Sequence, residues 1–257
     1  MATTAPLAPA TSTAYHGATP RLVALAALFT TFGAVAMAAS GTGYRFGSWG
    51  LLVAHCVLSC GAGLSGLGGV IALVALLQPS LRRHPRVVPI GAASLVAAII
   101  TSGTFGAWYV TAHMMPAIRD ISTDTADPPR FEVLHPTRHS GRGDRGYGDA
   151  DWPAEQRAAY PDIRPLMLSV SVTDAFQRAL LLAHSFGWQI ATADAAAGRI
   201  EAMATTPWYG FQNDVVVRLR AQGAETRVDV RSDSRLDESD AGTSASLVRR
   251  FMRMLRA

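Results

Sequence analysis

The residues best suited to chemistry lie in two segments of the C-terminal half, 214–220 and 226–232, where charged and apolar side chains alternate. Alternation with a period of two predicts paired β-strands with one apolar face and one charged face. The charged face and its flanks carry the candidate ligand-binding residues Glu201, Asp214, Arg218, Arg227, Asp229, Arg231 and Arg235. Clustered guanidinium groups can bind phosphate or carboxylate bidentately, so this face is the candidate site.

The pairing of the two strands decides which charges meet. A four-residue loop at residues 221–224 would place opposite charges across from each other in the pairs Arg220–Glu225 and Asp214–Arg231. The same register places Arg218 opposite Arg227, and these two guanidiniums then need an anion or another carboxylate, for which Glu201 is available. The alternative interpretation of the charged face is a solvated lattice of ion pairs without a ligand.

An enzyme is a further alternative for this half. Groups that could serve hydrolysis or metal binding are Asp124, Asp127, Asp229, Asp233, Asp240, Ser232 and Ser234. No set of serine, histidine and aspartate is recognisable, because His135, His139 and His184 fall in a polar stretch or on a helix. Nothing has metal-ligand spacing, and Cys56 and Cys60 lie in an apolar segment. We therefore expect no metal, no cofactor and no disulfide in the C-terminal half.

The elements that position these residues follow from periodicity and turn signals. A helix capped by Thr173 or Asp174 is predicted to run to Phe186, where Gly187 ends it. Strand-like runs and a closing helix follow at residues 188–193, 199–206, 214–220, 226–232 and 243–256. Short turns between the strands favour an antiparallel meander. The sequence therefore predicts an α+β domain with a sheet of about four strands packed by two helices.

The N-terminal half has the composition of a membrane region. All 19 acidic residues lie from Asp120 onward, and the only cations before Ile118 are Arg21, Arg45, Arg82, Arg83 and Arg86. Three charge-free windows each exceed the roughly 20 residues that cross a bilayer, which predicts spans near residues 22–39, 51–77 and 88–110. The expected organisation is a tail (1–20), a transmembrane region (21–113) and a soluble domain (114–257).

The charge balance excludes one class of partner. Subtracting the five N-terminal arginines from 23 basic residues leaves 18 against 19 acids, a formal charge of −1 for the C-terminal half. The pI of about 9.5 therefore reflects the membrane half. We expect no nucleic-acid binding.

The arginines also predict orientation. Arg82, Arg83 and Arg86 lie in the second connection and Arg21 precedes the first span, so the positive-inside rule puts both in the cytoplasm. The soluble domain would then lie outside the cytoplasmic membrane. The motif Ala36-Met37-Ala38 allows an alternative in which the first span is a cleaved signal, which leaves the domain on the same side.

Small residues in the second span allow close helix contact. Gly61, Ser65 and Gly69 recur every four residues. One interpretation is packing within a three-helix bundle, and the other is a homo-oligomer.

Several motifs carry a resemblance to a known family. They lie at residues 120–131, 159–163, 187–188, 199–202, 211–218 and 228–235. Together they resemble the bacterial family called domain of unknown function 1499, which has no assigned activity. The chain departs from the family pattern at Asn213, Asp237 and Ser244, where aspartate, glycine and asparagine are usual. Members with a similar membrane-spanning leader look like envelope proteins.

Three functions remain open. The first is a non-enzymatic binding or assembly module with an envelope partner, in which Asp120, Asp124 and Asp127 cap turns near the membrane. The second is an accessory subunit of a transport or lipid-handling complex. The third is a hydrolase.

Overall fold

The computed structural model describes residues 18–79, 84–115, 118–134, 151–236 and 240–257. The chain divides into two compact units, Met1–Tyr109 and Val110–Ala257. The first unit contains three helices that are long and apolar enough to cross a membrane: α1 (Ala18–Arg45), α2 (Leu51–Leu77) and α3 (Val88–Met114). The three apolar helices expected from the sequence are thus confirmed, and their length and composition indicate a membrane protein. The last turn of α3 belongs to the second unit.

Small residues bring the membrane helices together. A Cβ added to Gly33 on α1 would lie 2.5 Å from the carbonyl oxygen of Gly61 and 2.5 Å from the amide nitrogen of Ser65. A Cβ on Gly69 would lie 2.6 Å from the Cβ of Ala98 on α3. Gly61, Ser65 and Gly69 therefore serve packing within the bundle. A homo-oligomer through the same residues stays a prediction.

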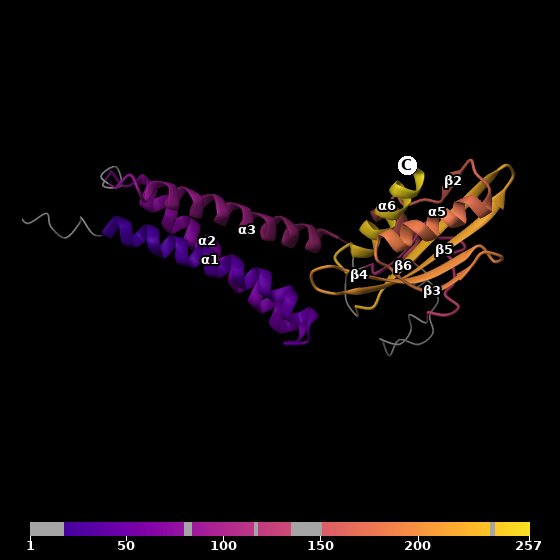
Figure 1. Ribbon diagram of the computed structural model, residues 1–257, viewed down its shortest axis with the longest axis horizontal. Coiled ribbons are helices and arrows are strands. Elements are labelled where there is room, and N and C mark those ends of the chain that lie inside the picture. The colour runs from indigo at the N-terminus through magenta and orange to yellow at the C-terminus, as the bar shows by residue number, and fades with distance from the viewer. Residues whose placement is uncertain (1–17, 80–83, 116–117, 135–150, 237–239) are drawn as a thin grey trace, which may run out of the picture. The chain divides into compact units, whose positions relative to one another are not determined.

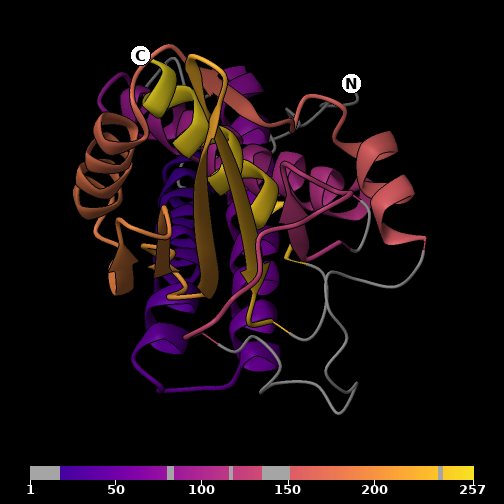
Figure 2. The ribbon, with the colours of Figure 1, turned by 90° about the vertical axis from the view of Figure 1, so that its right-hand side faces the viewer.

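The second unit is built on an antiparallel sheet with helices against one face. Its strands are β1 (Asp120–Ser122), β2 (Leu166–Leu168), β3 (Gln189–Asp194), β4 (Arg199–Thr205), β5 (Gln212–Gln222) and β6 (Glu225–Ser234). The order is β1-β6-β5-β4-β3, and β2 also pairs with β6. Helices α5 (Val172–Ser185) and α6 (Thr243–Arg256) lie on the same face of the sheet (Figure 1). Figure 2 shows the long β5–β6 hairpin with α6 behind it.

The α+β prediction is confirmed, with additions. The two short strands β1 and β2 and the helix α4 (Trp152–Ala159) are elements that the sequence analysis did not predict. Strands of three residues are too short to show a periodic pattern, so sequence periodicity does not detect them. The start of α5 also differs, because Ser171 rather than Thr173 or Asp174 is the cap and its Oγ accepts from the Asp174 amide at 3.1 Å.

Apolar side chains from the sheet and both helices form one core. Val215, Val217, Val228 and Val230 face the helices and are at most 1% exposed, and Phe251 of α6 is fully buried against them. The alternation of these strands therefore predicted the apolar face correctly. The opposite face carries the charged residues.

The predicted register of the β5–β6 hairpin is wrong by two residues. The loop contains only Gly223 and Ala224, and Gly223 has a φ of 63° at the first central position, which glycine adopts readily. Arg218 consequently lies opposite Asp229, as the ladder shows. The pairs Arg220–Arg227 and Asp214–Asp233 now bring like charges together. A shift of two residues preserves the faces, because side chains alternate with a period of two.

Candidate functional site

The charged face of the sheet is covered by a segment of irregular backbone. Residues 123–134, which we call the crossing segment, follow β1 and contact β6, β5 and β4 in turn. The segment begins with two hydrogen bonds between Thr123 and Val230, each 2.9 Å long. The Thr123 amide donates to the Val230 carbonyl, and the Val230 amide donates to Thr123 Oγ1. Charged side chains of the sheet hold the rest of it.

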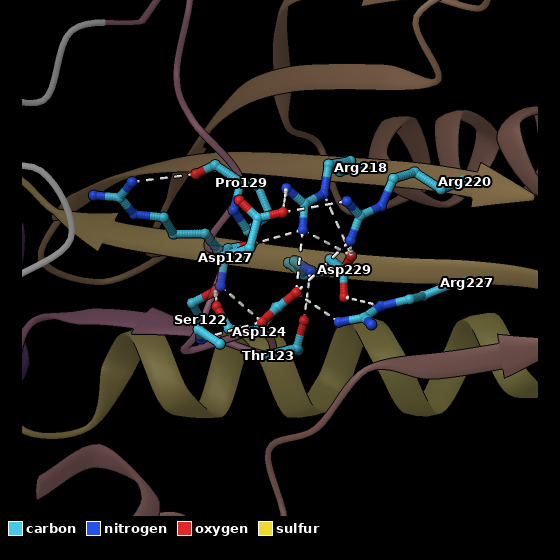
Figure 3. Close-up of polar contacts among 12 residues, drawn as sticks. Ser122, Thr123, Asp124, Asp127, Pro129, Arg218, Arg220, Arg227 and Asp229 are labelled. Atoms are coloured by element: carbon cyan, nitrogen blue, oxygen red, sulfur yellow. Dashed lines mark hydrogen bonds and ion pairs between the residues drawn. The ribbon is translucent and has the colours of Figure 1, made fainter. Parts of the chain in front are cut away.

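A cluster of three arginines and three aspartates lies where the crossing segment passes β5 and β6 (Figure 3). We call it the clamp cluster: Asp124, Asp127, Arg218, Arg220, Arg227 and Asp229. Asp229 is fully buried, and its Oδ2 accepts from Arg218 Nη2 at 3.0 Å and Arg220 Nη2 at 3.2 Å. Arg227 donates its Nε to Asp229 Oδ1 at 3.0 Å. One carboxylate therefore joins three guanidiniums.

The crossing segment supplies the other two carboxylates. Asp124 Oδ1 accepts from the amides of Ala126 and Asp127 at 3.1 and 3.0 Å, which folds a local turn. Its Oδ2 accepts from Arg227 at 2.6 Å. Arg218 donates to Asp127 Oδ2 at 3.1 Å and to the Asp127 carbonyl at 2.7 Å, and its charge holds the pKa of the Asp127 carboxyl below its usual value. The three positive charges meet three negative ones, and the cluster is neutral.

Arg231 anchors the middle of the crossing segment. Its Nε and Nη2 donate to the two carboxylate oxygens of Asp120 at 2.9 and 2.7 Å, a bidentate pair in which both side chains are at least 92% buried. Its Nη1 donates to the Pro129 carbonyl at 3.2 Å, and its guanidinium lies 5.2 Å from the centre of the Phe131 ring. One side chain thus joins β1, β6 and the crossing segment.

Glu201 holds the far end of the crossing segment. This fully buried carboxylate accepts three backbone amides, from Glu132 at 2.7 Å, Val133 at 3.0 Å and Leu134 at 2.8 Å. Glu132 also forms an ion pair with Arg199. The carboxylate of Glu201 therefore serves backbone groups that would otherwise lack partners within the strand ladder.

The seven predicted site residues make contacts that differ from those expected. Arg218, Arg227 and Asp229 do come together, but Glu201 is not their counter-ion, and Asp124 and Asp127 fill that role. Arg235, the fourth predicted arginine, makes separate contacts. It donates to both carboxylate oxygens of Asp214 (2.7 to 3.1 Å) and to Gln212 Oε1 (3.0 Å). Ligand binding at this face stays a prediction.

The carboxyl group of Asp233 lies between two carboxylates that each have an arginine partner. Asp233 faces Asp120 on one neighbouring strand and Asp214 on the other. Its Oδ1 is buried and has no hydrogen-bond partner among the described residues. Burial, and next the negative charge of Asp120, raise the pKa of Asp233 to about 8. A carboxyl group with this pKa is mainly protonated, and so mainly neutral, at pH 7.

We expect Asp233→Asn to stabilise the protein, by an amount that grows with pH. Between pH 4 and 8 the folded state holds a proton that the unfolded state has released, so the free energy of unfolding falls as pH rises, by at most about 1.4 kcal/mol per pH unit. An amide loses no proton. Thermal unfolding of the full-length protein in detergent at pH 5, 6.5 and 8 measures the effect. Parallel melting curves for both proteins would contradict it.

Sequence reasoning missed the crossing segment as a partner of the charged face. Asp120, Asp124 and Asp127 were expected to cap turns, and Asp124 does so. The arginines that bind these aspartates lie far along the chain: Arg218 is 91 residues after Asp127, and Arg231 is 111 residues after Asp120. Such contacts depend on the pairing of β1 with β6, so no local spacing in the sequence signals them.

Comparison with known proteins identifies the second unit. The family described as "Protein of unknown function (DUF1499)" matches residues 120–255, which is more than half of the chain. No curated protein matches the chain. The match covers the whole sheet, the crossing segment and nearly all of α6.

Proposed function

The chain belongs to the DUF1499 family of proteins of unknown function, and we propose that it is a membrane-anchored, non-enzymatic binding or assembly module of the cell envelope. Its three apolar helices anchor it in the cytoplasmic membrane. The arginines at the second connection support an extracytoplasmic position for the second unit.

The crossing segment carries this proposal. The carboxylates and guanidiniums that resemble catalytic groups are occupied in holding twelve residues of irregular backbone against the sheet, through Asp229, Arg231 and Glu201. A loop positioned by a rigid scaffold is the usual location of binding residues. The buried charges therefore support a role in shaping a surface rather than in a reaction.

The outward side of the crossing segment is the recognition surface that we propose. Arg130 and Glu132 are exposed, and the apolar side chain of Val133 is 54% exposed although its amide is bound by Glu201. Charged residues around an exposed apolar one resemble the rim and centre of a small protein interface. The partner is proposed to be another envelope protein.

Cysteine-directed crosslinking tests both the orientation and the surface. In a Cys56→Ser, Cys60→Ser background, Val133→Cys should react with a membrane-impermeant crosslinker in intact cells and yield a discrete adduct. Arg178→Cys, at an exposed position of α5, is the matched control and should react without a discrete partner. Reaction of both only after permeabilisation would refute the orientation. The same products from both positions would refute the surface.

A further inference from the structure

A basic groove lies beside α6, and none of the residues that line it belongs to the clamp cluster. Its volume is about 270 Å³, and it is bounded by α6, the turn at residues 162–164 and Thr123, the first residue of the crossing segment. Four arginines line it: Arg164, Arg249, Arg253 and Arg256. We propose that this groove binds a phosphate group carried by a ligand with an apolar part.

The positive charge of the groove is largely uncompensated. Its one lining carboxylate, Asp162, is engaged by Arg249 through two hydrogen bonds of 2.6 Å. Arg164 donates its Nε to the Pro161 carbonyl at 2.8 Å, which leaves its charge without a carboxylate among the described residues. Arg253 and Arg256 are exposed and have no ion-pair partner in the described part of the chain. The lining therefore carries three more positive than negative charges.

The arrangement on α6 concentrates this charge. Arg249, Arg253 and Arg256 are four and three residues apart, so they follow one stripe of the helix. Like charges at this spacing repel each other unless an anion lies between them. Arg250 is different, because its guanidinium lies 4.7 Å from the centre of the Phe186 ring, a packing contact outside the groove.

The chemistry of the groove favours phosphate over carboxylate. Three guanidiniums without a carboxylate partner present more donors than the two oxygens of a carboxylate can accept, whereas a phosphate monoester has three terminal oxygens. Ile163, Val248 and Met252 line the same groove, so an apolar part of the ligand can lie beside the anion. Free organic phosphate monoesters and the headgroup of phosphatidic acid share this chemistry.

Calorimetric titration of the full-length protein in nonionic detergent tests the site. The probes are inorganic phosphate and dihexanoyl phosphatidic acid, a soluble short-chain lipid. We expect saturable binding that weakens with added salt, and an affinity about tenfold or more lower in the Arg253→Gln, Arg256→Gln double variant. Both side chains are exposed, so the variant should keep its fold. Arg178→Gln, an exposed arginine of α5, is the control that should bind normally.

The two probes separate the sources of the phosphate. Tighter binding of the lipid supports a phospholipid headgroup, and equal binding of both supports a free phosphate compound. Absence of binding, or equal loss in the double variant and Arg178→Gln, overturns the proposal. The groove and the crossing segment are tested by different variants, so failure here leaves the proposed recognition surface untouched.

Discussion

Replacing Asp229 with alanine is expected to lower the free energy of unfolding of the second unit by about 3 to 5 kcal/mol. Asp229 is fully buried, and Arg218, Arg220 and Arg227 all donate hydrogen bonds to its carboxylate. Its loss leaves three guanidiniums around a buried void, and the side chain of Arg218 is only 14% exposed. Hydrogen–deuterium exchange of β5 and β6 peptides in the full-length protein in detergent measures the change.

Asp127→Ala is the matched control for that substitution. Asp127 also contacts Arg218 and Arg220, but its side chain is 62% exposed, so its ion pairs are screened by water. We expect its removal to cost less than about 1 kcal/mol. Equal exchange in the two variants would show that Asp229 does not organise the clamp cluster.

The same comparison bears on the hydrolase alternative. An enzyme that used Asp229 as a catalytic group would lose activity and keep its fold after the substitution. A carboxylate that joins three arginines and two strands is instead expected to affect stability first. Loss of protection in β5 and β6 therefore supports the structural role of the clamp cluster.

The sequence predicted the faces of the sheet better than the contacts made on it. Alternation along 214–220 and 226–232 assigns Val217 and Val230 to the core and Arg218 and Asp229 to the opposite face, as the structure has them. The turn was misjudged, because Gly223 supports a two-residue loop and not the four-residue one expected. An error of two residues changes every cross-strand pair but no face.

The cover over the charged face could not be predicted from spacing. The crossing segment has no hydrophobic periodicity, and its Asp-rich start is also typical of ordinary turns. Only the pairing of the three-residue strand β1 with β6 places Asp124 beside Arg227, across 103 residues of chain. Arg231 and Glu201 are buried under this cover, so the alternative interpretation of a solvated lattice does not describe these two side chains.

Glu201→Ala is expected to release the far end of the crossing segment. The carboxylate accepts three amides at 2.7 to 3.0 Å, and hydrogen bonds to a charged group contribute about 1.5 to 3 kcal/mol each. Because the freed amides can turn to water, we expect a net loss of about 2 to 4 kcal/mol. Exchange at residues 132–134 should rise by about a hundredfold, measured on the full-length protein.

Glu225→Ala is the control, since Glu225 is an exposed glutamate on β6 that accepts one hydrogen bond, from Ser169 at 3.1 Å. It should leave exchange at residues 132–134 unchanged. Release of the segment in Glu201→Ala should also abolish the discrete adduct of Val133→Cys, because a mobile side chain no longer presents a defined surface. Unchanged exchange in Glu201→Ala would mean that this carboxylate does not hold the segment, and the proposed recognition surface would lose its physical basis.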